Sequence, residues 1–177
     1  MRLHLGCGER FIAGWTHVDA IDHKHIDFVS SLDDLHFIPS NSVEIIYASH
    51  VLEHFYRSTV EKVLHEWHRT LQPGGCLRLA VPDFRVLANL YIKYQNIEII
   101  KGPICGRQDH KYNFHYNIFD EESLIMLLKG IGFINIHRWD WRCTEHSHID
   151  DFSQAYYPHM DKNNGVLISL NLEAIKH

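Results

Sequence analysis

The first nineteen residues constrain the fold of this chain more than any other segment. A short apolar run ends in the turn Gly6-Cys7-Gly8, and a second run, Thr16 to Asp19, ends in an acid. Glycine has no Cβ, so this turn can bend sharply and bring the backbone close to a ligand. An acid at the tip of the next strand can accept hydrogen bonds from two ribose hydroxyls. A Gly-x-Gly turn alone is common, but together with the acid it favours a nucleoside site at the edge of a parallel sheet.

Composition narrows the classes of protein that this chain can belong to. Its 177 residues predict one domain, residues 1–177, with 45% hydrophobic and 22% charged residues. The net charge of −5 gives no basic surface for nucleic acid. No apolar run approaches the roughly 20 residues of a membrane span, and the N-terminal residues do not resemble a signal peptide. The four cysteines are scattered, which is typical of reduced thiols, so we expect a cytoplasmic protein.

Short apolar runs alternate with helical patterns, which predicts a mostly parallel α/β sheet. We expect strands at Arg2–Leu5, Thr16–Asp19, Ile26–Val29, Val43–Ala48, Cys76–Val81, Phe133–Trp139 and, antiparallel, Val166–Ile175. A first helix is expected from a capping box of Ser58 and Glu61 to Pro73. Two more are expected at 83–94 and from Asp120 to Gly132.

Three segments depart from this alternation. Residues 96–119 contain two glycines and a proline and form an irregular candidate lid, and residues 140–165 form a long insertion. The first crossover has only about ten residues, near the lower limit for a parallel connection, so we expect no full helix there. Instead, Phe11, Ile12 and Trp15 should cover the sheet. A thinly covered face favours a homodimer.

Six segments, in order, resemble a small class I S-adenosylmethionine-dependent methyltransferase, of the kind associated with polysaccharide and glycan biosynthesis. They are Leu5-Gly-Cys-Gly8, Gly14-Trp-Thr-His-Val-Asp19, Ser42 to His54, Leu71 to Asp83, Asp120 to Leu124 with Gly132-Phe133, and Ser169 to Ala174. The resemblance implies a Rossmann-like, seven-stranded, mostly parallel sheet with one antiparallel strand. It also implies helices on both faces, here with a truncated first crossover helix.

The resemblance further implies that S-adenosylmethionine binds at the carboxyl ends of the first, second and fourth strands. The residues that it places around this cofactor are Leu5, Gly6, Cys7, Gly8, Asp19, Ala20, Ser31, Leu32, Asp33, Ala48, Ser49 and His50. Asp19 would hold the ribose hydroxyls, and the backbone of Leu32 would face the adenine. Ser31 stands where the family usually has an acid, so Asp33 is an alternative contact for the adenine amino group. No metal ion is expected.

Three residues are candidates for catalysis. His50 should lie beside the methyl donor and could act as general base or as a prop for the cofactor loop. His115, in the candidate lid, could take a proton from a hydroxyl, or lie in a plain surface loop. Asp83 could orient the acceptor or simply cap a helix.

Other polar clusters have competing interpretations. The segment His50-Val-Leu-Glu-His54 matches the zinc-protease pattern H-x-x-E-H. A strand directly before it favours the first turn after that strand, with Glu53 and His54 bracing the loop or touching substrate. In the insertion, Glu145 to Asp151 could bind a metal ion, but a solvated loop is the better interpretation. Trp139 and Trp141 are expected to pack rather than to stack on a ligand.

These observations lead to one functional hypothesis and two alternatives. The leading hypothesis is methyl transfer to a small polar acceptor, such as a sugar oxygen, with S-adenosylhomocysteine as the second product. The first alternative is a non-catalytic subunit that binds S-adenosylmethionine, suggested by Ser31 and the short first crossover. The second is a metal-dependent hydrolase that uses His50, Glu53 and His54.

Overall fold

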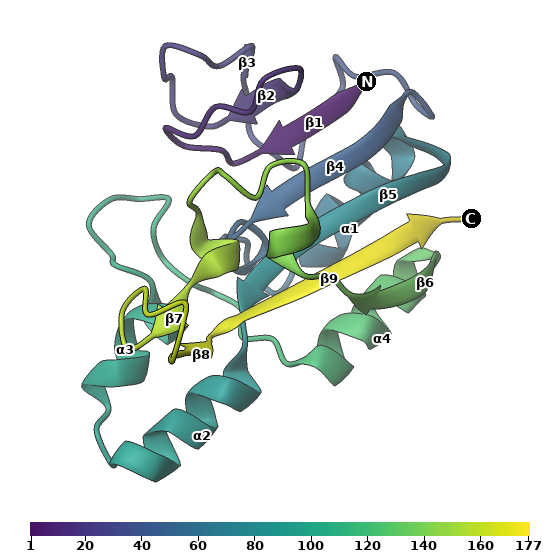
Figure 1. Ribbon diagram of the computed structural model, residues 1–177. Coiled ribbons are helices and arrows are strands. Elements are labelled where there is room, and N and C mark those ends of the chain that lie inside the picture. The colour runs from purple at the N-terminus through teal and green to yellow at the C-terminus, as the bar shows by residue number, and fades with distance from the viewer.

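A seven-stranded mixed sheet organises the chain, and the computed structural model describes all of it, residues 1–177 (Figure 1). The strand order is β3-β2-β1-β4-β5-β9-β6. The strands are β1 (Arg2–Leu5), β2 (Thr16–Asp19), β3 (Phe28–Val29), β4 (Val43–Ser49), β5 (Leu71–Pro82), β6 (Phe133–Arg138) and β9 (Ser169–Lys176). Strands β1 to β5 are parallel, whereas β9 runs antiparallel to both β5 and β6. The predicted sheet with one antiparallel strand is confirmed.

The predicted strands differ from the structure at β3, at β5 and in the C-terminal region. Strand β5 begins at Leu71, five residues before the predicted start at Cys76, so α1 ends at Thr70 and not at Pro73. Strand β3 has only two residues, both exposed. The predicted strand over 166–175 is divided into β8 (Val166–Leu167) and β9. Strand β8 leaves the main sheet to form a small antiparallel hairpin with β7 (Tyr156–Tyr157). This hairpin closes the insertion just before the chain returns to the sheet.

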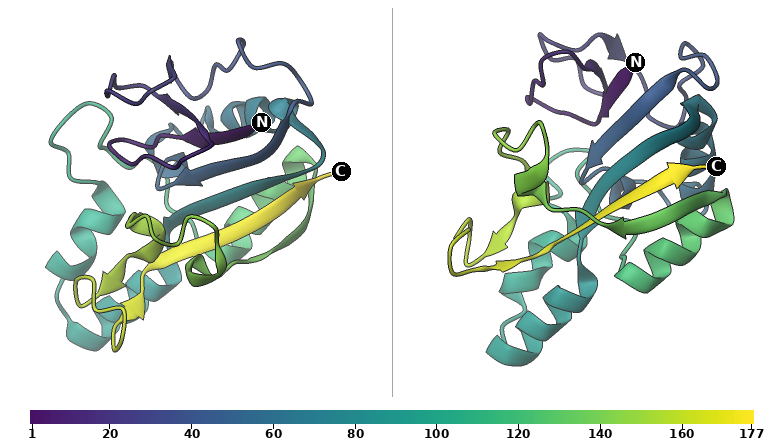
Figure 2. Two further views of the ribbon diagram at one scale, coloured as in Figure 1. Left: turned by 45° about the horizontal axis from the view of Figure 1, so that its top comes forward. Right: turned by 45° about the vertical axis from the view of Figure 1, so that its right-hand side comes forward.

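Two helices, α1 (Val60–Thr70) and α4 (Glu121–Ile131), cover one face of the sheet (Figure 2). Their apolar sides pack on alternate strand residues, and the resulting core includes Leu5, Ile46 and the fully buried Trp67. Burial of such side chains contributes about 1.5–3 kcal/mol each, so this layer stabilises most of the fold.

The predicted helix ends are partly right. At α4, Asp120 and Ser123 form a capping box, and Gly132 ends the helix with a φ of +112°. At α1, the capping box of Ser58 with Glu61 is wrong, because the N-cap is Thr59 and its side chain makes no capping bond. The Thr59 hydroxyl donates instead to the carbonyl of Tyr56, at 3.1 Å, inside the turn that precedes the helix.

No α-helix covers the second face, in contrast to the expected helices on both sides. The crossover after β1 is a loop, as predicted, and Ile12 and Trp15 are buried against Tyr47. Phe11 does not join them, because its side chain is 55% exposed and stacks on His17. The remaining cover is the insertion, with its short 3-10 turns at Trp141–Cys143 and Phe152–Gln154.

Two polar residues of the insertion, His146 and Asp151, are buried against this second face, whereas Glu145, His148 and Asp150 are exposed, so the solvated loop expected for this cluster is only partly right. The hydroxyl of Tyr47 donates to Asp151 Oδ2 at 2.5 Å, and His146 lies tilted on the Tyr47 ring with centroids 4.1 Å apart. Arg78 donates to Glu145 at 3.0 Å. Trp139 also packs here and donates to the carbonyl of Leu79. These bonds hold the insertion on the sheet.

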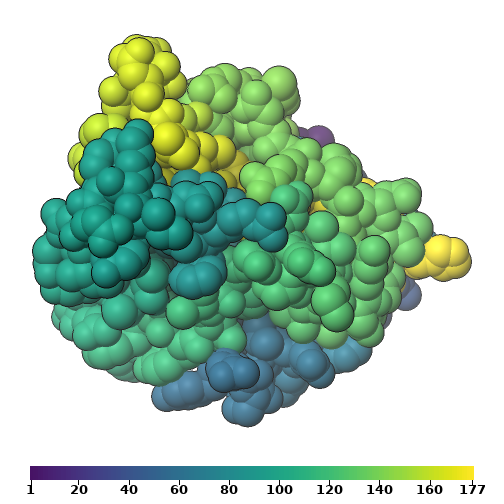
Figure 3. Space-filling view, turned by 90° about the horizontal axis from the view of Figure 1, so that it is seen from below, coloured from purple at the N-terminus to yellow at the C-terminus, as the bar shows by residue number.

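Part of the predicted lid is helical. Helix α2 (Phe84–Tyr94) begins after its N-cap Asp83, as predicted, but α3 (Glu98–Cys105) lies inside residues 96–119. Ile100 of α3 is buried, and its packing against α2 provides the contact that local sequence did not reveal. Figure 3 shows the two helices, in teal, beside the yellow β7–β8 hairpin. The irregular segment is therefore confined to residues 106–119.

No helix of this protein combines the length and the apolar character needed to cross a lipid bilayer.

Candidate functional site

A cavity of about 640 Å³ opens where β1, β2 and β4 end at their carboxyl edge. Eight of the twelve predicted cofactor residues line it: Gly6, Gly8, Asp19, Ala20, Ser31, Leu32, Asp33 and His50. The rest of its wall comes from the turn after β4 and from the irregular segment at residues 110–116. Two regions that are distant in sequence, the glycine turn and the segment beyond β4, therefore share one cavity.

The glycine turn is held by backbone geometry and by Asp19. Gly6 has a φ of +62°, and a Cβ there would overlap the Val51 side chain, so only glycine fits without strain. The Gly8 N–H donates to Asp19 Oδ2 and the Ile21 N–H to Oδ1, both at 2.8 Å. Each carboxylate oxygen keeps a further lone pair for a ligand. Asp19, which is 7% exposed, thus fixes both loops of the cavity and faces into it.

Four predicted cofactor residues do not line the cavity. Leu5, Cys7 and Ala48 are buried, and burial raises the pKa of the Cys7 thiol to about 12. Ser49 lies on the second face, where its hydroxyl accepts a hydrogen bond from the Ser153 N–H at 3.1 Å. The side chains of these four residues therefore pack within the fold.

The segment at residues 31–33 forms one side of the cavity. Its central carbonyl, that of Leu32, accepts a hydrogen bond from the Trp67 indole at 2.8 Å, which anchors the segment to α1. The Ser31 hydroxyl donates to Asp33, and Lys62 lies 3.5 Å from the other Asp33 oxygen. Ser31 and Lys62 therefore hold Asp33 in place, at the position where the sequence offers it as an alternative contact for the adenine amino group.

His50 occupies a constrained position at the end of β4. Its φ is +54°, and its N–H donates to the carbonyl of Ala80 at 2.8 Å. Its Nε2 hydrogen-bonds with the Ser169 hydroxyl at 3.0 Å, while Nδ1 lies 3.3 Å from Glu53 Oε1. The hydrogen bond of Nε2 to Ser169 and the close approach of Nδ1 to Glu53 hold the ring in place, which favours the prop interpretation over the general base.

The zinc-protease interpretation of this segment does not fit the structure. Only Leu52–His54 is helical, as one 3-10 turn, and His50 lies outside it. The pattern H-x-x-E-H requires both histidines on one face of a continuous helix. His50 points to Ser169 instead, so the two histidines of the motif do not form a ligand pair.

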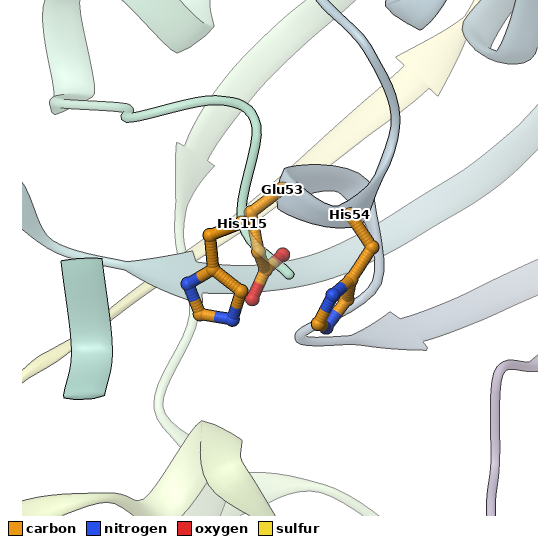
Figure 4. Close-up of side chains that lie close together, drawn as sticks. All are labelled: Glu53, His54 and His115. Atoms are coloured by element: carbon orange, nitrogen blue, oxygen red, sulfur yellow. The ribbon is translucent and has the colours of Figure 1, made fainter. Parts of the chain in front are cut away.

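The other half of the motif meets the lid segment. Glu53, His54 and His115 converge, as Figure 4 shows, with one ligand atom from each within 4.8 Å of the others. Burial raises the pKa of Glu53, but contact with His50 and the charges of His54 and His115 outweigh it and hold this pKa below its usual value. Burial lowers the pKa of His115, so its ring is neutral at neutral pH. His115 does not itself line the cavity, whereas His54 does.

Aromatic side chains complete the cavity wall and were not predicted as site residues. Tyr56 and Tyr112 line it together with Tyr116, whose ring centroid lies 4.4 Å from that of Tyr56. The only sequence signal was the aromatic content of the lid. Nothing in the sequence indicated that the residues after His54 would face it.

Asp83 is not brought to the cavity. Its side chain accepts from the Val86 N–H as the N-cap of α2, and Arg138 lies 3.3 Å from its second oxygen. It is almost completely buried, so the capping role is the one that the structure supports.

The strand order, the single antiparallel strand and the cavity at the carboxyl ends of the first strands together define a class I methyltransferase fold. Comparison of the sequence with known families agrees, because the family described as a methyltransferase domain matches residues 3–79. This match includes β1, β2 and most of the cavity. No curated protein matches the sequence significantly.

Solved structures share this fold at low sequence identity. A SAM-dependent methyltransferase from Thermotoga maritima, named as a possible histamine N-methyltransferase, aligns with a TM-score of 0.61 and 13% identity over 99% of this chain and 82% of that one. A SAM-dependent methyltransferase from Archaeoglobus fulgidus aligns with a TM-score of 0.59 and 16% identity, over 99% of this chain and 85% of that one.

The 1,6-didemethyltoxoflavin-N1-methyltransferase of Burkholderia thailandensis was solved with 1,6-didemethyltoxoflavin and S-adenosylhomocysteine bound. It aligns with a TM-score of 0.59 and 15% identity, over 99% of this chain and 70% of that one. Together, these matches support S-adenosylmethionine as the cofactor of this fold.

Proposed function

We propose that this protein transfers a methyl group from S-adenosylmethionine to a hydroxyl oxygen of a small polar acceptor, such as a sugar. One observation carries the proposal: the glycine turn with Asp19 and the segment from His50 to Tyr56 line the same cavity. Its volume of about 640 Å³ falls in the range of small-molecule sites. The methyltransferase-domain match covers the strands that form this cavity.

The residues present fit the cofactor. Asp19 offers free lone pairs at the end of β2, where a ribose would be held, and Ser31 and Asp33 offer polar atoms on the adenine side. Gly6 and Gly8 keep the turn free of side chains. When bound, S-adenosylmethionine supplies an activated methyl group, and an acceptor oxygen displaces the sulfur from it, so that S-adenosylhomocysteine and a proton are released.

The chain itself supplies position and a proton acceptor. Tyr56, Tyr112 and Tyr116 offer ring faces on which a sugar can lie, which supports the choice of a hydroxylated acceptor. His54 and His115 each use only Nδ1 in a protein hydrogen bond, so Nε2 of either ring can accept the hydroxyl proton. His50 lines the cavity beside them, with Nδ1 3.3 Å from Glu53 Oε1.

The test is the affinity of S-adenosylhomocysteine, measured by calorimetry for the wild type and for Asp19→Asn. Loss of hydrogen bonds to a charged carboxylate costs about 1.5–3 kcal/mol, so we expect the Kd to rise by about 10- to 150-fold. Asp27→Asn is the matched control, because Asp27 also accepts a backbone N–H, from His17 at 2.8 Å, but lies outside the cavity. Equal affinities in wild type and Asp19→Asn would contradict the proposal.

Turnover identifies the acceptor class. Formation of S-adenosylhomocysteine, followed on a panel of sugars, nucleotide sugars and small amines, should be stimulated by hydroxylated compounds. Stimulation by amines alone would redirect the proposal to nitrogen acceptors. Tight cofactor binding without turnover on any acceptor would favour the non-catalytic subunit instead.

A further inference from the structure

Glu53, His54 and His115 form a cluster in which the two histidines were assigned the hydroxyl proton, whereas the buried Glu53 carboxylate has no role in the proposed chemistry. Glu53 and His54 lie in the turn after β4, and His115 follows α3, so the cluster joins two distant segments. One carboxylate oxygen and two imidazole nitrogens lie within 4.8 Å of one another, and all three side chains point into the same space (Figure 4). Among the titratable side chains of the chain, this is the one group of three with such an arrangement.

The Glu53 carboxylate is buried without a hydrogen-bond partner. Its side chain is 1% exposed, and neither oxygen has a donor within hydrogen-bonding geometry. His50 Nδ1 is 3.3 Å from Oε1 but makes no hydrogen bond to it. A buried, ionised carboxylate without a partner is strongly unfavourable, so buried charges are normally paired or coordinate a metal ion. A cation in the space that Glu53 faces would satisfy it.

Both histidines are oriented for coordination. The Nδ1–H of His54 donates to the carbonyl of Phe114 at 3.1 Å, and that of His115 donates to the carbonyl of Pro103 at 2.9 Å. These bonds fix the tautomer and leave Nε2 of each ring with a free lone pair. A hydrogen bond from the second ring nitrogen to a backbone carbonyl is a regular feature of histidines that bind metals.

Backbone hydrogen bonds hold the two segments together. The N–H groups of Tyr116 and Asn117 both donate to the carbonyl of Glu53, at 2.8 and 3.2 Å. Gly106 allows the chain to approach His115, because a Cβ there would overlap a lid carbonyl and lie 3.0 Å from His115 Cδ2. The cluster is thus fixed by the main chain and does not depend on chance side-chain positions.

We propose that Glu53, His54 and His115 bind a divalent transition metal ion, such as Zn²⁺, in the wall of the cavity. Two imidazoles and one carboxylate are a ligand set typical of such ions, whereas Mg²⁺ and Ca²⁺ prefer oxygen alone. Ligands about 2.1 Å from a tetrahedral ion lie about 3.4 Å apart, so the ligand atoms, now within 4.8 Å of one another, need to approach by at most about 1.4 Å on binding. This site differs from the protease motif, because His50 stays with Ser169 and His115 takes its place.

Three protein ligands leave a coordination position open, and His54 places the ion at the edge of the cavity. An acceptor hydroxyl bound there would lose its proton more readily, because a bound cation lowers the pKa of an oxygen that coordinates it. With both Nε2 atoms on the ion, that proton would pass to solvent water and not to His54 or His115. This role for the ion rests on the proposed methyl transfer, whereas the binding of the ion does not.

The experiment measures Zn²⁺ binding by untagged, metal-stripped protein, with equilibrium dialysis and elemental analysis. We expect one tight equivalent, and an absorption spectrum of four- or five-coordinate Co²⁺ when that ion is used. His115→Ala and His54→Ala should weaken binding by more than about 100-fold. Glu53→Gln, which keeps the shape of the side chain, should do the same, and circular dichroism should show that each variant is folded.

Two control variants test the location of the site. His65→Ala removes an exposed histidine of α1, and His25→Ala removes one from the histidine group near the first crossover, so both should bind Zn²⁺ as the wild type does. Absence of a tight equivalent in the wild type, unchanged binding by folded His115→Ala, or loss of binding in His25→Ala would each overturn the proposal.

S-Adenosylhomocysteine affinity, measured on the same samples, separates the two proposals. Zn²⁺ binding without cofactor binding would leave the metal site standing and remove the methyltransferase function. Cofactor binding without Zn²⁺ binding would do the reverse.

Discussion

Acid should destabilise this protein through His4, which lies on the second face of the sheet. The His4 side chain is 1% exposed, its ring stacks on Tyr47 with centroids 5.2 Å apart, and its Nδ1 has no hydrogen-bond partner. Burial lowers the pKa of His4 from 6.5 to about 3. Neighbouring groups that lower it further are His17, His146, Arg10 and His25.

The sign of the effect follows from proton uptake. Below pH 6.5 the unfolded chain takes up a proton at His4 that the folded chain refuses until about pH 3, so stability falls as the pH falls through this window. With a pKa of 6.5 in the unfolded chain and about 3 in the folded one, the free energy of unfolding drops by about 2 kcal/mol between pH 7 and pH 5.

His4→Phe isolates this contribution, because phenylalanine keeps an aromatic ring against Tyr47 and cannot titrate. We expect the loss of unfolding free energy between pH 7 and pH 5, measured by urea with tryptophan fluorescence, to be about 2 kcal/mol smaller than in the wild type. Burial also lowers the pKa values of His17 and His146. Both residues remain in both proteins, so their contributions to the pH dependence cancel in the comparison. The same pH dependence in both proteins would refute the reasoning. His65→Phe, at an exposed site, should show none of the change.

Two further substitutions test the cavity floor and the second face. Gly6→Ala adds a Cβ that overlaps Val51 at a φ of +62° and should cost about 3 kcal/mol in urea unfolding. Adding Val51→Ala to this variant should restore the part of the stability that the overlap removes. Without any recovery, the loss would come from backbone strain at Gly6 alone. Tyr47→Phe leaves buried Asp151 Oδ2 without its donor and should lower stability by about 1.5–3 kcal/mol. A loss below 0.5 kcal/mol, roughly the scatter of surface substitutions, would show that water replaces the hydroxyl.

Local spacing predicted the elements that hold the cavity. The boundaries of β1 and β2 agree with the structure because the glycine turn and Asp19 mark where each strand ends. The caps Asp120 and Gly132 were visible for the same reason, since both act within a few residues of their own position.

Contacts between distant residues could not be predicted in this way. The bond between Tyr47 and Asp151 joins residues 104 positions apart, and it turns a loop that looks solvated into cover for the sheet. The bond between His54 and Phe114 spans 60 positions and brings the lid to the turn after β4. The histidine that joins Glu53 is therefore His115 from the lid, while the motif itself pointed to His50.

The insertion also decides which parts of this protein can be shortened. Residues 140–165 look dispensable beside a compact sheet, yet they seal Tyr47 and pair Arg78 through Glu145. A protein engineered without them would expose this face of the sheet to solvent, including Tyr47 and Arg78. This segment is a structural wall, and changes of substrate preference by loop grafting belong instead at residues 107–113, of which residues 110–113 line the cavity.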